Sequence, residues 1–173
     1  KKAENDMFKN FQLRGGIYVM DKSVHITGYF ELEPWRGIDE DGNVNGYVNS
    51  QWDVMASYSQ KEKFTIGADI NSKSFDGIQS IDAIGTSIFG HVYIVPKKLK
   101  GLLRYDIYST GLNDAEVKSG DSKLQSDGSL LLVGLDYKPH KKVSIIPNFQ
   151  MTNYQDSEVN SMKSVYIHMI FKL

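Results

Sequence analysis

The sequence predicts an all-β protein built as an antiparallel meander, and three observations support this fold class. Apolar and polar residues alternate in nine segments from one end of the chain to the other, which is the period of a β-strand. Helical spacing of apolar residues fits almost nowhere. The connections between the segments alternate between short and long, as a meander of hairpins requires.

Seven of the nine predicted strands have a clear period of two, and 13–20 and 81–95 are less regular. In chain order the nine strands are 13–20, 24–33, 48–58, 64–71, 81–95, 103–108, 131–137, 143–152 and 165–173. The segment 81–95 is apolar on both faces in places, so the sequence leaves its orientation open. Gly15 and Gly16 predict a bulge or a close approach of neighbouring strands. Pro147 predicts a second bulge, because a paired strand loses a ladder hydrogen bond at proline.

Composition excludes several classes of protein. The 173 residues include no cysteine, so disulfides, thiolate metal sites and a cysteine nucleophile are excluded. Twenty basic and 21 acidic residues give a net charge of −1, which argues against nucleic acid as a partner. No run of 18 apolar residues is present, so the sequence predicts no transmembrane helix.

The connections indicate a membrane-spanning sheet. The short ones are 21–23, 60–63, 96–101 and 138–142, and the long polar ones are 34–46, 72–80, 110–128 and 153–163. Tight turns on one side and extended loops on the other are typical of outer-membrane β-barrels. We therefore expect an antiparallel transmembrane β-barrel in a Gram-negative outer membrane, with outer-membrane lipid around it.

The composition of the two faces favours lipid on the apolar side. The polar face has few Lys or Glu and is rich in Asn, Gln, Ser, Thr, Gly and isolated Asp, which suits a wet lumen. Aromatic residues occur near the predicted strand ends on the apolar face, where the aromatic girdle of a membrane barrel meets the lipid headgroups. They are Phe30, Tyr58, Phe64, Tyr137 and Phe171.

The last predicted strand has an apolar residue at every second position. These residues are Val165, Ile167, Met169, Phe171 and Leu173. The segment resembles the C-terminal strand of outer-membrane proteins, with Leu173 in place of the usual terminal aromatic residue. This resemblance implies recognition by the barrel-assembly machinery.

The last third of the chain resembles the C-terminal strands of porins related to the phosphate-selective porin family. The residues that carry the resemblance are Arg104-Tyr105-Asp106, Gly134 to Pro139, Lys142-Val143 and Pro147-Asn148, within 100–173. The family implies a large barrel, often a homotrimer, that passes small hydrophilic solutes and selects anions with lumenal Arg and Lys residues.

Charged and histidine residues of the polar face are the candidate pore lining. They are His25, Glu31, Glu33, Asp53, Asp69, Arg104, Asp106, Asp136 and His168. The basic residues Arg14, Lys73 and Arg104 are outnumbered by acidic ones, so a general or weakly cation-preferring pore fits better than a phosphate-selective one. Arg104 and Asp106 point the same way, and an ion pair between them would either stabilise the wall or add to the field at a constriction.

Strand parity bears on completeness. Bacterial single-chain barrels have an even number of strands and both termini in the periplasm. Nine strands with a periplasmic C-terminus would place residues 1–10 outside as an external segment. We therefore expect either a miscount by one or the C-terminal portion of a barrel of 16–18 strands, completed by an upstream segment.

Other chemistry has weak support. Asp39, Asp41 and Asn43 resemble a calcium loop, but Val44 and Ser50 occupy the positions where an EF-hand needs Gly and Glu, so a turn is the simpler interpretation. The four histidines lack metal-ligand spacing and no nucleophile elbow exists, so we expect no enzyme, no catalytic residues, no metal and no cofactor. Two alternatives stay open: a complete small barrel with a structural or adhesive role, and a soluble lipocalin-like barrel that binds an apolar ligand.

Overall fold

The computed structural model describes residues 9–38, 44–76, 81–110, 127–155 and 160–172. These residues form nine strands. Their bounds are β1 Phe11–Val19, β2 Val24–Ile38, β3 Val44–Gln60, β4 Phe64–Phe75, β5 Ile81–Val95, β6 Leu99–Ser109, β7 Gly128–His140, β8 Val143–Tyr154 and β9 Met162–Phe171. The predicted all-β fold is confirmed, and in the described part of the chain no helix is long and apolar enough to cross a membrane.

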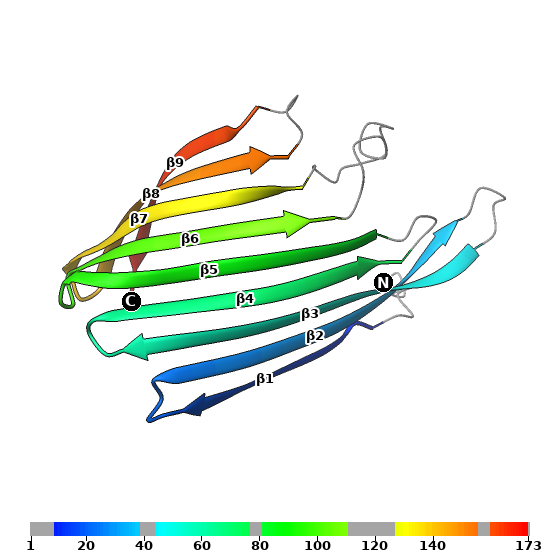
Figure 1. Cartoon of the computed structure of the whole chain (residues 1–173), viewed down its shortest axis with the longest axis horizontal. Coiled ribbons are helices and arrows are strands. Elements are labelled where there is room, and N and C mark those ends of the chain that lie inside the picture. Colours follow the sequence, from blue (N-terminus) through cyan, green and yellow to red (C-terminus); the bar gives the residue numbers. More distant parts are fainter. Residues whose placement is uncertain (1–8, 39–43, 77–80, 111–126, 156–159, 173) are drawn as a thin grey trace, which may run out of the picture.

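The strands form one antiparallel meander. Their order in the sheet is their order in the chain, and each strand contacts only its neighbours in sequence. The sheet is curved and open (Figure 1), because β1 pairs only with β2 and β9 pairs only with β8. An odd number of antiparallel strands also makes β1 and β9 run in the same direction.

One end of the sheet carries tight turns, and we call it the short-turn end. Three of its turns close with the same bond between residues three apart: Ser23 N to Met20 O, Lys63 N to Gln60 O and Lys98 N to Val95 O, each 3.0 Å. All five described non-glycine residues with a left-handed backbone lie in these turns, at Met20, Asp21, Lys22, Glu62 and Lys97. This geometry is typical of the tight turns of β-hairpins. We call the opposite end the long-connection end.

The hairpin of β2 and β3 is longer than predicted. The expected connection 34–46 is wrong at both of its ends, because pairing continues from Pro34 opposite Val48 to Ile38 opposite Val44. The rings of Trp35 and Tyr47, which face each other across this extension, stack with centroids 4.8 Å apart. Cross-strand aromatic packing stabilises a strand pair where alternation is weak.

The bulge predicted at Pro147 is wrong. Pro147 lies opposite Ile167 of β9, and the β7–β8 register is the same on either side of it. The missing N–H therefore removes pairing locally without adding a residue to either strand. The irregularity of this hairpin lies instead between Tyr137 and His140.

The glycine pair in β1 marks a close approach without a bulge. The β1–β2 register runs without a shift through Gly15 and Gly16. A Cβ added at Gly16 would lie 2.9 Å from Cγ2 of Thr27, so the absence of a side chain lets the two strands pack closely there.

The structure also determines the orientation of β5, which the sequence left open. Ile84, Ile88 and Val92 lie on the exposed face of the sheet, whereas Ser87 on the other face is 3% exposed. Phe89 and Tyr93 share the face of Ser87, which explains why the segment is apolar on both sides.

Candidate functional site

The sheet carries its polar and charged residues on the less exposed face and its large aliphatic residues mainly on the more exposed face. Among the described residues no large apolar side chain is buried, whereas five polar residues are: Ser87, Thr110, Asp136, Ser144 and Asn148. On the other face Ile88 is 61% exposed and Val165 is 74% exposed. The large apolar side chains of the described sheet therefore have no covered core to pack into.

All nine candidate lining residues lie on the polar face. The cross-strand register puts them there by parity, from His25 on β2 to His168 on β9. It also aligns them into rows, such as Asp69, Ser87 and Asp106 on β4, β5 and β6. The sequence-predicted set is therefore one continuous surface.

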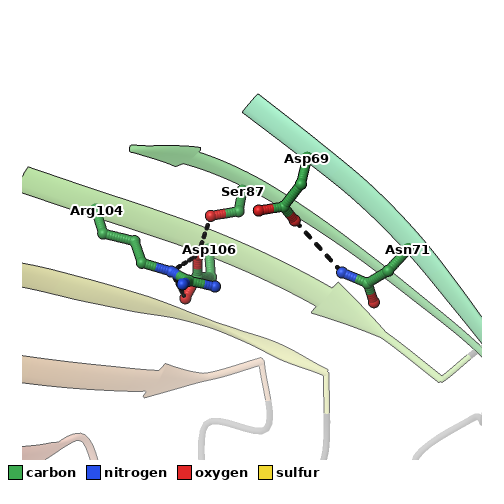
Figure 2. A network of polar contacts seen from close by, with 5 residues as sticks. All are labelled: Asp69, Asn71, Ser87, Arg104 and Asp106. Atoms are coloured by element: carbon green, nitrogen blue, oxygen red, sulfur yellow. Dashed lines mark hydrogen bonds and ion pairs between the residues drawn. The ribbon is translucent and has the colours of Figure 1, made fainter. Parts of the chain in front are cut away.

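Figure 2 shows polar contacts on the middle strands β4, β5 and β6 of this surface, and we call these residues the central cluster. Arg104 Nε lies 2.8 Å from Oδ1 and 3.0 Å from Oδ2 of Asp106, so the predicted ion pair is confirmed. Ser87 Oγ donates to Asp106 Oδ1 at 2.5 Å, and Asn71 Nδ2 donates to Asp69 Oδ1 at 3.5 Å. The cluster fixes two carboxylates on the polar face with only one guanidinium beside them.

Glu31 forms a second cluster, toward the long-connection end. Its carboxylate accepts hydrogen bonds from Tyr29 Oη at 2.6 Å, Gln12 Nε2 at 2.8 Å and Asn10 Nδ2 at 3.3 Å. Glu33, two residues further along β2, accepts from Asn49 Nδ2 at 3.4 Å. The side chains that donate hydrogen bonds to these two carboxylates are all neutral.

Asp136 forms a third cluster, near the short-turn end. Lys100 Nζ lies 3.1 Å and Lys138 Nζ 3.9 Å from its Oδ2, while Ser144 Oγ donates to its Oδ1. The side chains of Lys100 and Asp136 are 18% and 9% exposed, so this ion pair lies against the wall. Here two cations surround one anion, the reverse of the central cluster.

An uncovered hollow of about 400 Å³ lies on the polar face over β1 to β4, between the Glu31 cluster and the central cluster. Arg14, Asp53 and Asn71 contribute to its lining from β1, β3 and β4. Charged and amide groups of three strands thus face a common space large enough for several waters.

Asp127 lies next to the end of β6, at the long-connection end of the sheet. Its carboxylate accepts hydrogen bonds from Ser109 Oγ and from both the N–H and the hydroxyl of Thr110. Burial raises the pKa of Asp127, but these three hydrogen bonds outweigh burial and leave the pKa below its ordinary value of 3.8.

The histidines lie apart from one another. The ring of His25 stacks on Tyr18 with centroids 4.0 Å apart, and the ring of His168 lies 6.1 Å from that of Tyr166. In the described ranges no three His, Asp or Glu residues are arranged to hold a metal ion. The calcium-loop candidates Asp39, Asp41 and Asn43 lie outside the described residues.

Aromatic residues of the apolar face gather at the short-turn end. Tyr58, Phe64, Tyr137 and Phe171 all lie within a few residues of a strand end there. The placement predicted for Phe30 is wrong, because the extension of β2 to Ile38 leaves Phe30 at the middle of the strand. The terminal-strand residues Val165, Ile167, Met169 and Phe171 lie on this same exposed face, and Leu173 lies outside the described residues.

Sequence reasoning missed several residues of the polar face. Ser87 was out of reach because the orientation of β5 was open, although its small neighbour Gly85 marks the same face. Lys100 was missed because it lies in the segment 96–101, which was taken as a turn. The alternation of 143–152 puts Ser144 and Asn148 on the polar face, but it does not predict the contact of Ser144 with Asp136 or the burial of Asn148, which is 6% exposed.

The geometry defines a fold class rather than a family: an open, curved antiparallel meander with one polar, charged face. Comparison of the chain with protein-family models, with curated proteins and with solved structures found no match.

Proposed function

We propose that the chain forms part of the wall of an outer-membrane porin, through which small hydrophilic solutes or ions diffuse passively along a polar lumen. The observation that carries the proposal is the distribution of polarity among the described residues, where the buried side chains are polar and the large apolar side chains are exposed or only partly covered. A lipid bilayer is the solvent in which an exposed apolar face lowers the free energy.

The aromatic residues support the same environment. A belt of Tyr58, Phe64, Tyr137 and Phe171 on the apolar face fits the level of lipid headgroups, where amphipathic rings are favoured. The short-turn end would then face the periplasm and the long-connection end the outside.

The proposal includes closure of the sheet by further strands. An open edge leaves backbone N–H and C=O groups without partners, and lipid cannot supply any. Since β1 and β9 run in the same direction, an antiparallel closure needs an odd number of added strands. Seven or nine would give the 16 or 18 strands that leave an aqueous channel. Such strands would come from elsewhere in the same chain or from a partner, and a homotrimer is compatible with this.

Ion preference follows from the fixed charges. The described polar face carries five acidic and three basic residues toward its middle and its long-connection end. The acidic residues are Glu31, Glu33, Asp53, Asp69 and Asp106, and the basic ones are Arg14, Lys73 and Arg104. We propose a general pore that weakly prefers cations, rather than a phosphate-selective one.

Conductance in a planar bilayer tests the function. The full natural protein, extracted in detergent, should produce stepwise increases in current that lipid and detergent alone do not produce. A protein that stays monodisperse without detergent and gives no steps would contradict the proposal and favour a soluble barrel. A detergent-dependent protein that never conducts would favour the structural or adhesive role instead.

A further inference from the structure

Basic residues are concentrated at one end of the sheet. Ten of the 20 basic residues lie in or beside the short turns or at residue 172, against three of the 21 acidic residues. The lysines are Lys22, Lys61, Lys63, Lys97, Lys98, Lys100, Lys138, Lys141, Lys142 and Lys172, and the acidic residues are Asp21, Glu62 and Asp136.

Six of these lysines lie on the polar face by register, and we call them the basic rim: Lys63, Lys98, Lys100, Lys138, Lys142 and Lys172. Backbone bonds align them across the strands. Lys138 N donates to Lys98 O at 2.7 Å, and Lys172 N donates to Lys142 O at 2.9 Å. On this part of the face the only described acidic residue is Asp136, which lies between Lys100 and Lys138.

In the rest of the described polar face the sign is opposite, since five acidic residues outnumber three basic ones there. Lys100 of the rim and Asp106 of the central cluster lie on the same strand, six residues apart. At about 3.3 Å per residue this separates the two zones by roughly 20 Å. The screening length is only about 10 Å in 0.1 M salt, so each zone sets its own local ion population.

We propose that this charge separation makes the pore rectify: it conducts more when the long-connection side is positive than when it is negative. The inference rests on the porin function proposed above. Cations gather in the acidic zone and anions at the basic rim. A positive long-connection side drives both toward the junction of the zones and raises the ion concentration there, whereas the opposite polarity depletes the junction.

Single-channel recording tests the inference with the full natural protein. In 0.1 M KCl, currents at equal and opposite voltages should differ by about twofold or more, and in 1 M KCl, where the screening length falls to about 3 Å, the ratio should approach one. Channels that conduct equally in both directions at 0.1 M would overturn the inference and leave the porin function standing. A protein that forms no channel overturns both.

Two triple variants connect the asymmetry to the rim. Lys98→Gln with Lys138→Gln and Lys142→Gln should bring the current ratio in 0.1 M KCl close to one. The matched control, Lys22→Gln with Lys61→Gln and Lys141→Gln, removes the same charge from turn positions at the same end and should keep the asymmetry. Equal conductance of both variants in 1 M KCl verifies that each still folds. If both triple variants lose the current asymmetry equally, the asymmetry does not come from the lysines of the polar face. The same conclusion follows if the current ratio changes with the content of anionic lipid in the leaflet that faces the short-turn end.

Discussion

Each carboxylate of the described polar clusters is held by donors of its own. Asp106 accepts from Arg104 and Ser87, and Glu31 accepts from Tyr29 and Gln12. Hydrogen bonds to an ionised acceptor are about twice as strong as neutral ones, so these side chains are fixed rather than free to sweep the face. Charges held in fixed positions are what the proposed pore wall needs in order to prefer one kind of ion.

Asp127 gives a residue-scale prediction about pH. Its pKa is lower in the folded protein than in the unfolded chain, so its stabilising effect is complete above its ordinary pKa of 3.8 and is lost as the pH falls through the lower folded value. Asp127→Asn should lower the free energy of unfolding at pH 7 by about 1 kcal/mol, a figure reduced for solvent screening.

Urea unfolding of the detergent-bound protein between pH 7 and pH 3 measures this effect. The difference between the wild type and Asp127→Asn should shrink toward the acidic end of that range. Asp82→Asn, which neutralises an aspartate at the same end of the sheet, serves as the control. If the difference is the same at every pH, hydrogen bonding to the ionised carboxylate is not the cause.

At the scale of the strands, the period-two pattern predicted the number of strands and the face of each of the nine candidate lining residues. The pattern suffices because a one-residue change of register would reverse every side chain of a strand. It failed at Trp35, where β2 continues without alternation, and at β5, where Phe89 and Tyr93 share the polar face with Ser87. It also gave no contacts across strands, since the partner of a residue such as Lys100 depends on turn geometry.

Two glycines on the apolar face give an element-scale prediction. A Cβ at Gly90 would lie 2.7 Å from the carbonyl oxygen of Thr65, whereas one at Gly101 would lie 3.6 Å from Cγ1 of Val92, an ordinary contact. Gly90→Ala should therefore lower the free energy of unfolding by about 1–3 kcal/mol, because the backbone of β4 must move. Gly101→Ala on the adjacent strand should change it by less than about 1 kcal/mol.

Equilibrium unfolding of both variants in the same detergent provides the comparison. If alanine costs the same at both positions, the close β4–β5 approach at Gly90 is not a determinant of stability.

At the scale of the whole molecule, the proposed lipid environment predicts a dependence on depth. Ile88 and Ile94 lie on the same face of β5 and are 61% and 55% exposed, but Ile88 is at mid-strand and Ile94 is next to the turn. In a bilayer Ile88→Lys should cost about 2–4 kcal/mol and Ile94→Lys about 0–1 kcal/mol.

Urea titration in lipid vesicles measures both costs. A face exposed to water would tolerate the two lysines equally well, because the two isoleucines are similarly exposed. Equal and small costs would therefore contradict the membrane environment and, with it, the porin proposal.

Each described strand contacts only the strand before it and the strand after it, so the sheet should respond to force as a linear array of hairpins. No shared apolar core links β1 to β5 or β5 to β9 in the described sheet, so each hairpin is held only by the strands beside it. Under a pulling force applied at one terminus, the sheet should separate from that end, one strand or one hairpin at a time, instead of unfolding as a unit. The force record should then be a sawtooth whose spacing follows the lengths of the hairpins, and removing the strand at the pulled end should delete one peak and leave the others in place.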